Sequence, residues 1–100
     1  MSVKEILIKT KDILNTNGWI QGKYRSECGV CLSEAIQEAG GETSSSFPEV
    51  FHLVEGSDAM AAHRFLESRL GMKLFMFNDY SFRTKEHIIY MLDEAIAAAP

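Results

Sequence analysis

The sequence predicts a mainly α-helical protein: a single small helical domain over residues 1–100, with about four helices and one short extended segment near residues 73–77. Apolar residues recur three and four positions apart in four stretches, which is the spacing of one face of a helix. Each stretch is bordered by residues that begin or end helices, such as serine, threonine and glycine. With 46% apolar residues, a chain of 100 residues can bury one small core.

Residues 3–16 are predicted to form the first helix. Its apolar stripe consists of Ile6, Leu7, Thr10, Ile13 and Leu14. Ser2 suits the N-cap of this helix, and Glu5 stands at the matching position of a capping box. Gly18 follows a polar stretch and suits the residue just beyond a helix end, where a positive φ is common.

A second, shorter helix is predicted after the irregular residues 19–29. Its stripe consists of Cys31, Leu32, Ala35, Ile36 and Ala39, and Gly40 and Gly41 end it. An irregular loop follows over about residues 40–57, and loops of this length are typically mobile or functional. The second half of the loop is apolar, so we expect Phe47, Val50, Phe51, Leu53 and Val54 to fold back onto the core.

Two further helices are predicted in the second half of the chain. Ser57 or Asp58 caps the third helix, and Gly71 ends it. Residues 73–77 are too short and too apolar for a separate amphipathic helix, so they are predicted to form a buried extended segment. Thr84 caps the fourth helix, whose stripe consists of Ile88, Met91, Leu92, Ala95 and Ile96.

Charge and hydropathy exclude several classes of function. The net charge is −4 and the isoelectric point is near 5.3, so no overall positive field favours nucleic acid, and a helix-turn-helix reader is disfavoured. The chain has no apolar run near the roughly 20 residues of a membrane span. The first residues lack the apolar stretch of a signal peptide. We therefore expect a cytoplasmic protein that contacts neither membrane nor nucleic acid.

Four short motifs resemble those of one family of small proteins. They are Gly18-Trp19-Ile20-Gln21-Gly22, Gly29-Val30-Cys31-Leu32 with Ala35-Ile36, Phe77-Asn78-Asp79, and Arg83-Thr84. In order and spacing they are similar to the motifs of a domain-of-unknown-function family from bacteriophages and actinobacteria. The chain departs from that family at Phe77, where tryptophan is usual, and at Ser33-Glu34, where a glycine before the alanine is common. The resemblance implies a small helical protein, with a phage-encoded accessory protein as one interpretation, and it implies no catalytic residues.

Cys28 and Cys31 form a Cys-x-x-Cys pair with three interpretations. A redox motif should follow a strand of a thioredoxin-like unit, and here it follows a polar loop. A zinc site needs two more ligands, and the spacings of His52, His63 and His87 match no known finger. The structural interpretation is favoured, because Cys31 lies on the apolar stripe of the second helix. We expect no metal and no cofactor, and Cys28 is the better candidate for reactivity if it lies at a helix N-terminus.

Trp19, Gln21, Asp79 and Arg83 are the candidate ligand-binding residues. Trp19 could stack on a ligand, although an aromatic residue just past a helix end more often closes the core. Gln21 could bond the backbone of its loop or point into a small-molecule pocket. Asp79 and Arg83 could contact a ligand or could form a structural pair with each other.

Two classes of function remain open. The first is a non-enzymatic binding or interaction module that acts on a host or self protein or on a small molecule, with a homodimer as one form. The second is a small enzyme or small-ligand-binding protein with a polar site near Trp19, Gln21, Asp79 and Arg83. The cluster of Met72, Phe75, Met76 and Phe77 belongs to the core, or, if exposed, favours a partner site.

Overall fold

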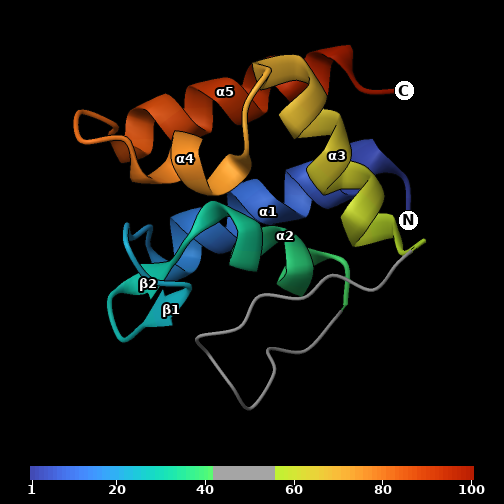
Figure 1. Ribbon diagram of the computed structural model, residues 1–100. Coiled ribbons are helices and arrows are strands. Elements are labelled where there is room, and N and C mark those ends of the chain that lie inside the picture. Colours follow the sequence, from blue (N-terminus) through green and yellow to red (C-terminus); the bar gives the residue numbers. More distant parts are fainter. Residues whose placement is uncertain (42–55) are drawn as a thin grey trace.

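The structure is a computed structural model that describes residues 1–41 and 56–100 (Figure 1). The described elements are α1 (Val3–Asn17), β1 (Arg25–Ser26), β2 (Gly29–Val30), α2 (Leu32–Ala39), α3 (Asp58–Leu70), α4 (Leu74–Asp79) and α5 (Lys85–Ala98). The predicted mainly α-helical fold is confirmed. None of these helices has the length and apolar character needed to cross a lipid bilayer.

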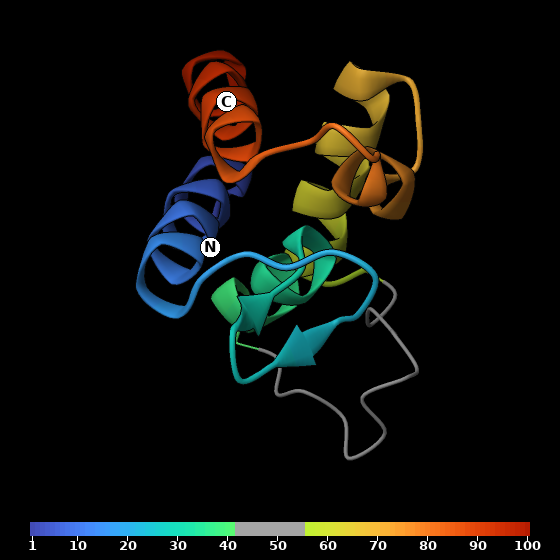
Figure 2. The same cartoon turned by 90° about the vertical axis from the view of Figure 1, so that its left-hand side faces the viewer.

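Helix α1 is the centre of the arrangement. It packs against α2, α3, α5 and β2, while α2 also packs against α3 and α4. Figure 1 shows α1 between α5 and α2, with the hairpin of β1 and β2 at one end. In the view turned by 90°, α1 and α5 lie on one side, α3 and α4 on the other, and α2 below them (Figure 2).

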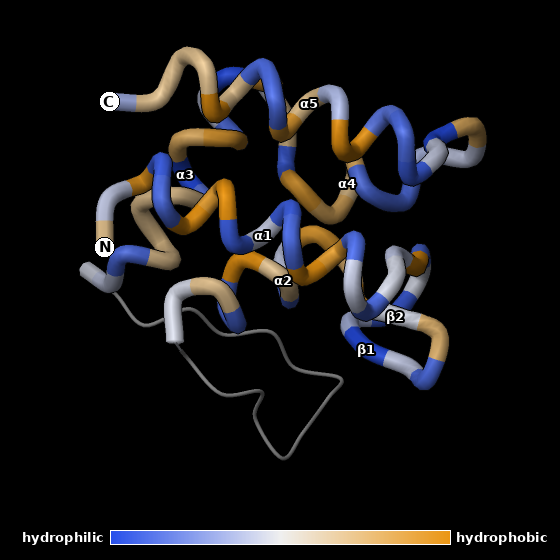
Figure 3. Tube along the Cα trace, turned by 180° about the vertical axis from the view of Figure 1, so that it is seen from behind, coloured by the Kyte–Doolittle hydropathy of each residue, from blue (hydrophilic) through white to orange (hydrophobic). Residues whose placement is uncertain are grey.

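The core is formed by one face each of α1, α2, α3 and α5, together with Leu74 and Phe77 of α4 and Val30 of β2. Each fully buried leucine or isoleucine side chain contributes about 1.5–3 kcal/mol relative to an exposed one. Figure 3 shows apolar stretches on the helices that surround α1. The largest apolar side chains that are completely buried are Ile6, Leu7, Leu14, Leu32, Ile36, Leu66, Leu74, Ile88 and Leu92.

The ends of the helices match the predicted caps. The Ser2 hydroxyl accepts a hydrogen bond from the Glu5 amide, and the Glu5 carboxylate accepts one from the Ser2 amide, which completes the capping box. The Ser57 hydroxyl accepts a hydrogen bond from the Met60 amide at the start of α3, and Thr84 and His87 form a second capping box at the start of α5. Gly71 ends α3 with a left-handed backbone, at φ 69°.

The predicted extended segment near residues 73–77 is wrong, because residues Leu74–Asp79 form helix α4. A helical turn places Leu74 and Phe77 on one side, where both are buried. The Glu67 carboxylate accepts a hydrogen bond from the first amide of the helix, that of Leu74, at 2.9 Å. The Lys73 side chain makes no capping hydrogen bond, so Glu67 of α3 supplies the acceptor for the first amide of α4 instead.

Residues 19–29, expected to be irregular, contain β1 and the first residue of β2, and these two strands form a small antiparallel hairpin. Arg25 pairs with Val30, and Ser26 pairs with Gly29. Val30 also bridges to Trp19, so the backbone after α1 lies directly against β2. Gly18 and Gly29 meet there: a Cβ on Gly18 would lie 2.3 Å from the Cys28 carbonyl oxygen, and one on Gly29 would lie 2.4 Å from the Gly18 carbonyl.

The prediction of a long irregular loop falls largely on residues 42–55, which lie outside the described residues. The same holds for His52 and for the apolar residues 47–54 that were expected to fold back. The described residues on either side are Gly40 and Gly41, which end α2, and Gly56 and Ser57, which precede α3.

Candidate functional site

Asn78, at the end of α4, lies at the centre of a hydrogen-bond network. Its side-chain oxygen accepts hydrogen bonds from Trp19 Nε1 at 2.6 Å and from the Leu32 amide at 3.0 Å. Its side-chain nitrogen donates to the Ile20 carbonyl at 3.0 Å and to Asp79 Oδ1 at 2.9 Å. The residue is 1% exposed, so the amide is buried with two donated and two accepted hydrogen bonds.

Gln21 and Asp79 extend this network to the end of α4. Gln21 Nε2 donates to the carbonyl oxygens of Asn78 and Tyr80, at 2.9 and 2.8 Å. These carbonyls belong to the end of a helix, where intrahelical partners are missing. The Asp79 carboxylate accepts a hydrogen bond from the Gly22 amide at 3.0 Å. We call Trp19, Gln21, Gly22, Asn78 and Asp79 the Asn78 network.

Arg83 belongs to a neighbouring contact. Its Nε donates to the Phe77 carbonyl at 2.9 Å, and its guanidinium carbon lies 3.7 Å from the centre of the Phe77 ring and 5.2 Å from that of Tyr80. Such cation–π contacts stabilise by about 0.5–2 kcal/mol. Arg83 and Asp79 form no ion pair with each other, although a structural pair was one of the interpretations.

The structure therefore brings Trp19, Gln21 and Asp79 together around Asn78, while Arg83 contacts Phe77 instead. The polar atoms of Trp19 and Gln21 are used by hydrogen bonds to α4. The sequence identifies Asn78 only as part of the Phe77-Asn78-Asp79 motif and does not predict its central role. The available signal was a polar residue directly after the apolar run 74–77.

A pocket of about 480 Å³ lies beside the Asn78 network. It is bounded by residues of the hairpin, the first turn of α2, and α4. Its walls combine aromatic side chains, charged groups of both signs and a serine hydroxyl. The residues that line it are Gly22, Lys23, Tyr24, Arg25, Cys31, Ser33, Phe75, Asn78 and Asp79.

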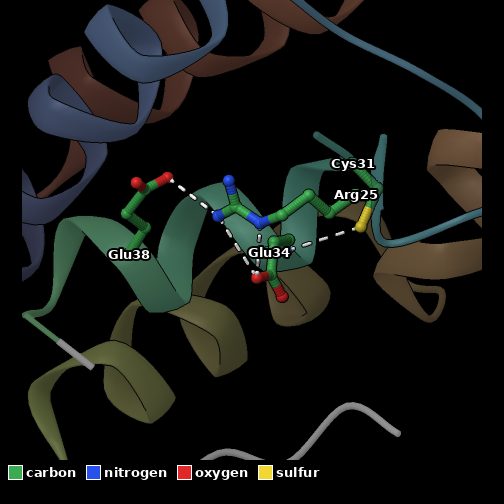
Figure 4. A network of polar contacts seen from close by, with 4 residues as sticks. All are labelled: Arg25, Cys31, Glu34 and Glu38. Atoms are coloured by element: carbon green, nitrogen blue, oxygen red, sulfur yellow. Dashed lines mark hydrogen bonds and ion pairs between the residues drawn. The ribbon is translucent and has the colours of Figure 1, made fainter. Parts of the chain in front are cut away.

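Cys31 is the N-cap of α2 and forms part of the pocket wall. Its sulfur accepts a hydrogen bond from the Glu34 amide at 3.5 Å, and burial raises the pKa of the thiol to about 11 (Figure 4). Cys28 is exposed in the hairpin turn and not at a helix N-terminus, so the structural reason for expecting Cys28 to be reactive is wrong. Both thiols are free.

Arg25 connects the hairpin to α2. Its Nη2 lies 3.3 Å from Glu34 Oε1 and 3.3 Å from Glu38 Oε2, and Figure 4 shows the guanidinium between the two carboxylates. The Glu34 side chain is only 7% exposed, so Arg25 supplies the positive charge that a buried carboxylate needs. Among residues 1–41 and 56–100, no group of three or more histidine, cysteine, aspartate or glutamate side chains could hold a metal ion.

One family model matches the chain, over residues 1–98. It is described as a family of unknown function, DUF6197. No curated protein and no solved structure matches the chain. The match covers nearly the whole length, and it agrees with the resemblance that the four motifs indicate. The chain therefore belongs to the DUF6197 family of unknown function.

Proposed function

We infer that this protein is a binding module that docks a segment of a partner protein, and that the contact surface lies on α4 and the turn after it. The observation that carries this proposal is the exposure of large apolar side chains between Met72 and Phe82. Phe75 is 60% exposed, Met76 56%, Tyr80 57% and Phe82 78%. We call Met72, Phe75, Met76, Tyr80 and Phe82 the α4 surface.

Local packing explains why these side chains point outward. Helix α4 is six residues long and uses Leu74 and Phe77 to contact the core, which leaves the intervening Phe75 and Met76 in solvent. Single exposed apolar residues are ordinary, but several large ones within one short segment are typical of a binding surface. Methionine suits such a surface, because its flexible side chain adapts to different partners.

The charges around the α4 surface favour an acidic partner. Lys23 lines the pocket beside Phe75, Lys73 directly precedes α4, and Lys85 begins α5. None of these three lysines forms an ion pair within residues 1–41 and 56–100. The chain as a whole carries a net charge of −4, so three lysines that form no ion pair within the described residues are distinctive. A partner segment with aromatic or aliphatic side chains next to aspartate or glutamate would fit the exposed apolar side chains of the α4 surface and the lysines.

The pocket beside Phe75 offers a place for one anchoring side chain of the partner. Binding energy in protein interfaces is concentrated in a few side chains that fill pockets near the centre of the contact. Tyr24 and Phe75 provide apolar walls, and Lys23 lies beside them. A role for Trp19, Gln21, Asp79 and Arg83 in ligand binding stays a prediction. Within that set, Asp79 lines the pocket. The phage-encoded accessory role also stays a prediction.

Selection of peptides from a random twelve-residue display library tests the proposal. We expect enriched peptides to carry an aromatic or large aliphatic residue next to aspartate or glutamate. Their dissociation constants should rise about tenfold or more for the variant Phe75→Ser/Met76→Ser, since loss of one anchor costs at least about 1.4 kcal/mol. Tyr90→Ser is the matched control, because Tyr90 is 68% exposed on α5 and lies outside the α4 surface.

Three outcomes would contradict the proposal. The selected peptides could bind the double variant as tightly as the unaltered protein, or they could lack acidic residues. Sedimentation could also show a dimer that the double variant dissociates, in which case the surface binds a second copy of this chain. Added salt should weaken peptide binding if the lysines contribute, because exposed charges are screened.

A further inference from the structure

A serine, a histidine and a glutamate from two neighbouring helices form a connected chain behind the pocket. Ser33 Oγ lies 3.1 Å from His63 Nε2, and His63 Nδ1 lies 3.6 Å from Glu67 Oε1. The other carboxylate oxygen, Glu67 Oε2, accepts the hydrogen bond from the Leu74 amide at 2.9 Å. The glutamate is therefore held in place by the start of α4 while it faces the imidazole.

The order of contacts is that of a nucleophile, a base and an orienting carboxylate. A carboxylate near Nδ1 favours the tautomer with its proton on that nitrogen, which makes Nε2 the acceptor for the proton of the Ser33 hydroxyl. Ser33 belongs to the first turn of α2 and lines the pocket of about 480 Å³. Ser33 is thus both the partner of the imidazole and a residue of the pocket wall.

The protonation of His63 suits the role of a base. Burial lowers the pKa of His63 below its ordinary value of 6.5, and the positive charge of Lys73 acts in the same direction, while Glu67 opposes both. The imidazole is accordingly neutral near pH 7 and can accept a proton. The neighbouring thiol of Cys31 is protonated at that pH, because its pKa is about 11, so the serine is the better nucleophile of the two.

We propose that Ser33, His63 and Glu67 form a catalytic triad that hydrolyses a carboxylic ester bound in the pocket. Ser33 is the nucleophile, His63 the general base and acid, and Glu67 a positioning residue. The aromatic walls of Tyr24 and Phe75 fit an apolar acyl group. The proposal uses the pocket and does not depend on the docking of a partner protein.

The reaction balances with water as the second substrate. Ser33 Oγ adds to the ester carbonyl carbon as its proton passes to His63 Nε2. The tetrahedral intermediate then collapses, the bond to the alcohol oxygen breaks, and His63 gives its proton to the departing alcohol. Water attacks the resulting acyl-serine with the same histidine as base, and the products are a carboxylic acid, an alcohol and the free serine.

A fluorophosphonate probe tests the assignment on the unaltered protein. We expect one covalent adduct in the intact mass, and peptide mapping should place it on Ser33. Labelling and the hydrolysis of 4-nitrophenyl butyrate should both fall to background in Ser33→Ala. The exposed hydroxyl of Ser68 provides the matched control, so Ser68→Ala should retain both. An adduct on another residue, or none on the folded protein, would overturn the proposal.

The pH profile distinguishes catalysis from a structural role of the histidine. The rate should fall at low pH as His63 is protonated, with a midpoint below 6.5 because the pKa of the buried imidazole is lowered. Glu67→Gln removes the negative charge that raises this pKa, so the midpoint should move to lower pH while kcat falls about tenfold or more. A Glu67→Gln variant that keeps the kcat of the unaltered protein would remove the residue from the triad, whatever its midpoint.

Discussion

At the scale of single residues, burial decides which of the two cysteine thiols can ionise and react. Cys28 and Cys31 look alike in the sequence, but Cys28 is exposed in the hairpin turn and Cys31 is buried at the N-cap of α2. Desolvation disfavours the thiolate, and this cause outweighs the amide hydrogen bonds that favour it at Cys31. The two thiols of the Cys-x-x-Cys pair therefore differ in their chemistry.

Alkylation with iodoacetamide at pH 8 should separate the two thiols. The pKa of Cys31, about 11 against an ordinary 9.0, lowers its thiolate fraction about 100-fold, and burial hinders the reagent further. We expect one adduct, on Cys28, in the native protein and two adducts in denaturant, as measured by intact mass. Equal modification of both thiols in the native protein would show that Cys31 is not desolvated.

At the scale of elements, the sequence predicts the four longer helices because each carries apolar residues at helical spacing and a residue that begins or ends a helix. Ser2 and Thr84 are confirmed as N-caps, and of the two candidates Ser57 and Asp58 it is Ser57 that caps α3. Helix α4 is not predictable in this way, since Lys73 makes no side-chain cap and the six residues hold no full stripe. The hairpin has two residues in each strand, which is too few for an alternating pattern.

The close approach of Gly18 and Gly29 gives a prediction for the junction between α1 and β2. Gly18→Ala should destabilise the protein by about 3 kcal/mol or more, because the new methyl group meets the Cys28 carbonyl and φ is 93°. Gly71→Ala is the matched control: φ is 69° and nothing lies within 4 Å, so only the backbone strain of about 1–2 kcal/mol applies. Urea unfolding measures the free energy of unfolding of both variants. Equal losses in the two variants would show that the backbones at Gly18 and Cys28 do not touch.

At the scale of the whole molecule, the Asn78 network joins segments that are far apart in the sequence. Trp19 and Gln21 follow α1, while Asn78 and Asp79 end α4, and the hydrogen bonds between them span 57 to 59 residues. Helical periodicity carries no information about such contacts. The sequence thus predicts which residues are distinctive and does not predict that they meet.

Two groups of distinctive residues, the Asn78 network and the α4 surface, have different roles in this small fold. The Asn78 network fixes the end of α4 against the hairpin and α2, and so it shapes one side of the pocket. The α4 surface lies outside the core and is the surface that we propose contacts a partner. A change in the first group should therefore affect stability, whereas a change in the second should affect binding.

Equilibrium urea unfolding of Asn78→Ala tests this separation most directly. The substitution leaves Trp19 Nε1, the Leu32 amide and the Ile20 carbonyl without their partner, and each unsatisfied buried group costs about 1–3 kcal/mol. We predict a loss of about 3–5 kcal/mol in the free energy of unfolding, against less than about 0.5 kcal/mol for the exposed Asn15→Ala. An Asn78→Ala variant as stable as the unaltered protein would contradict the account.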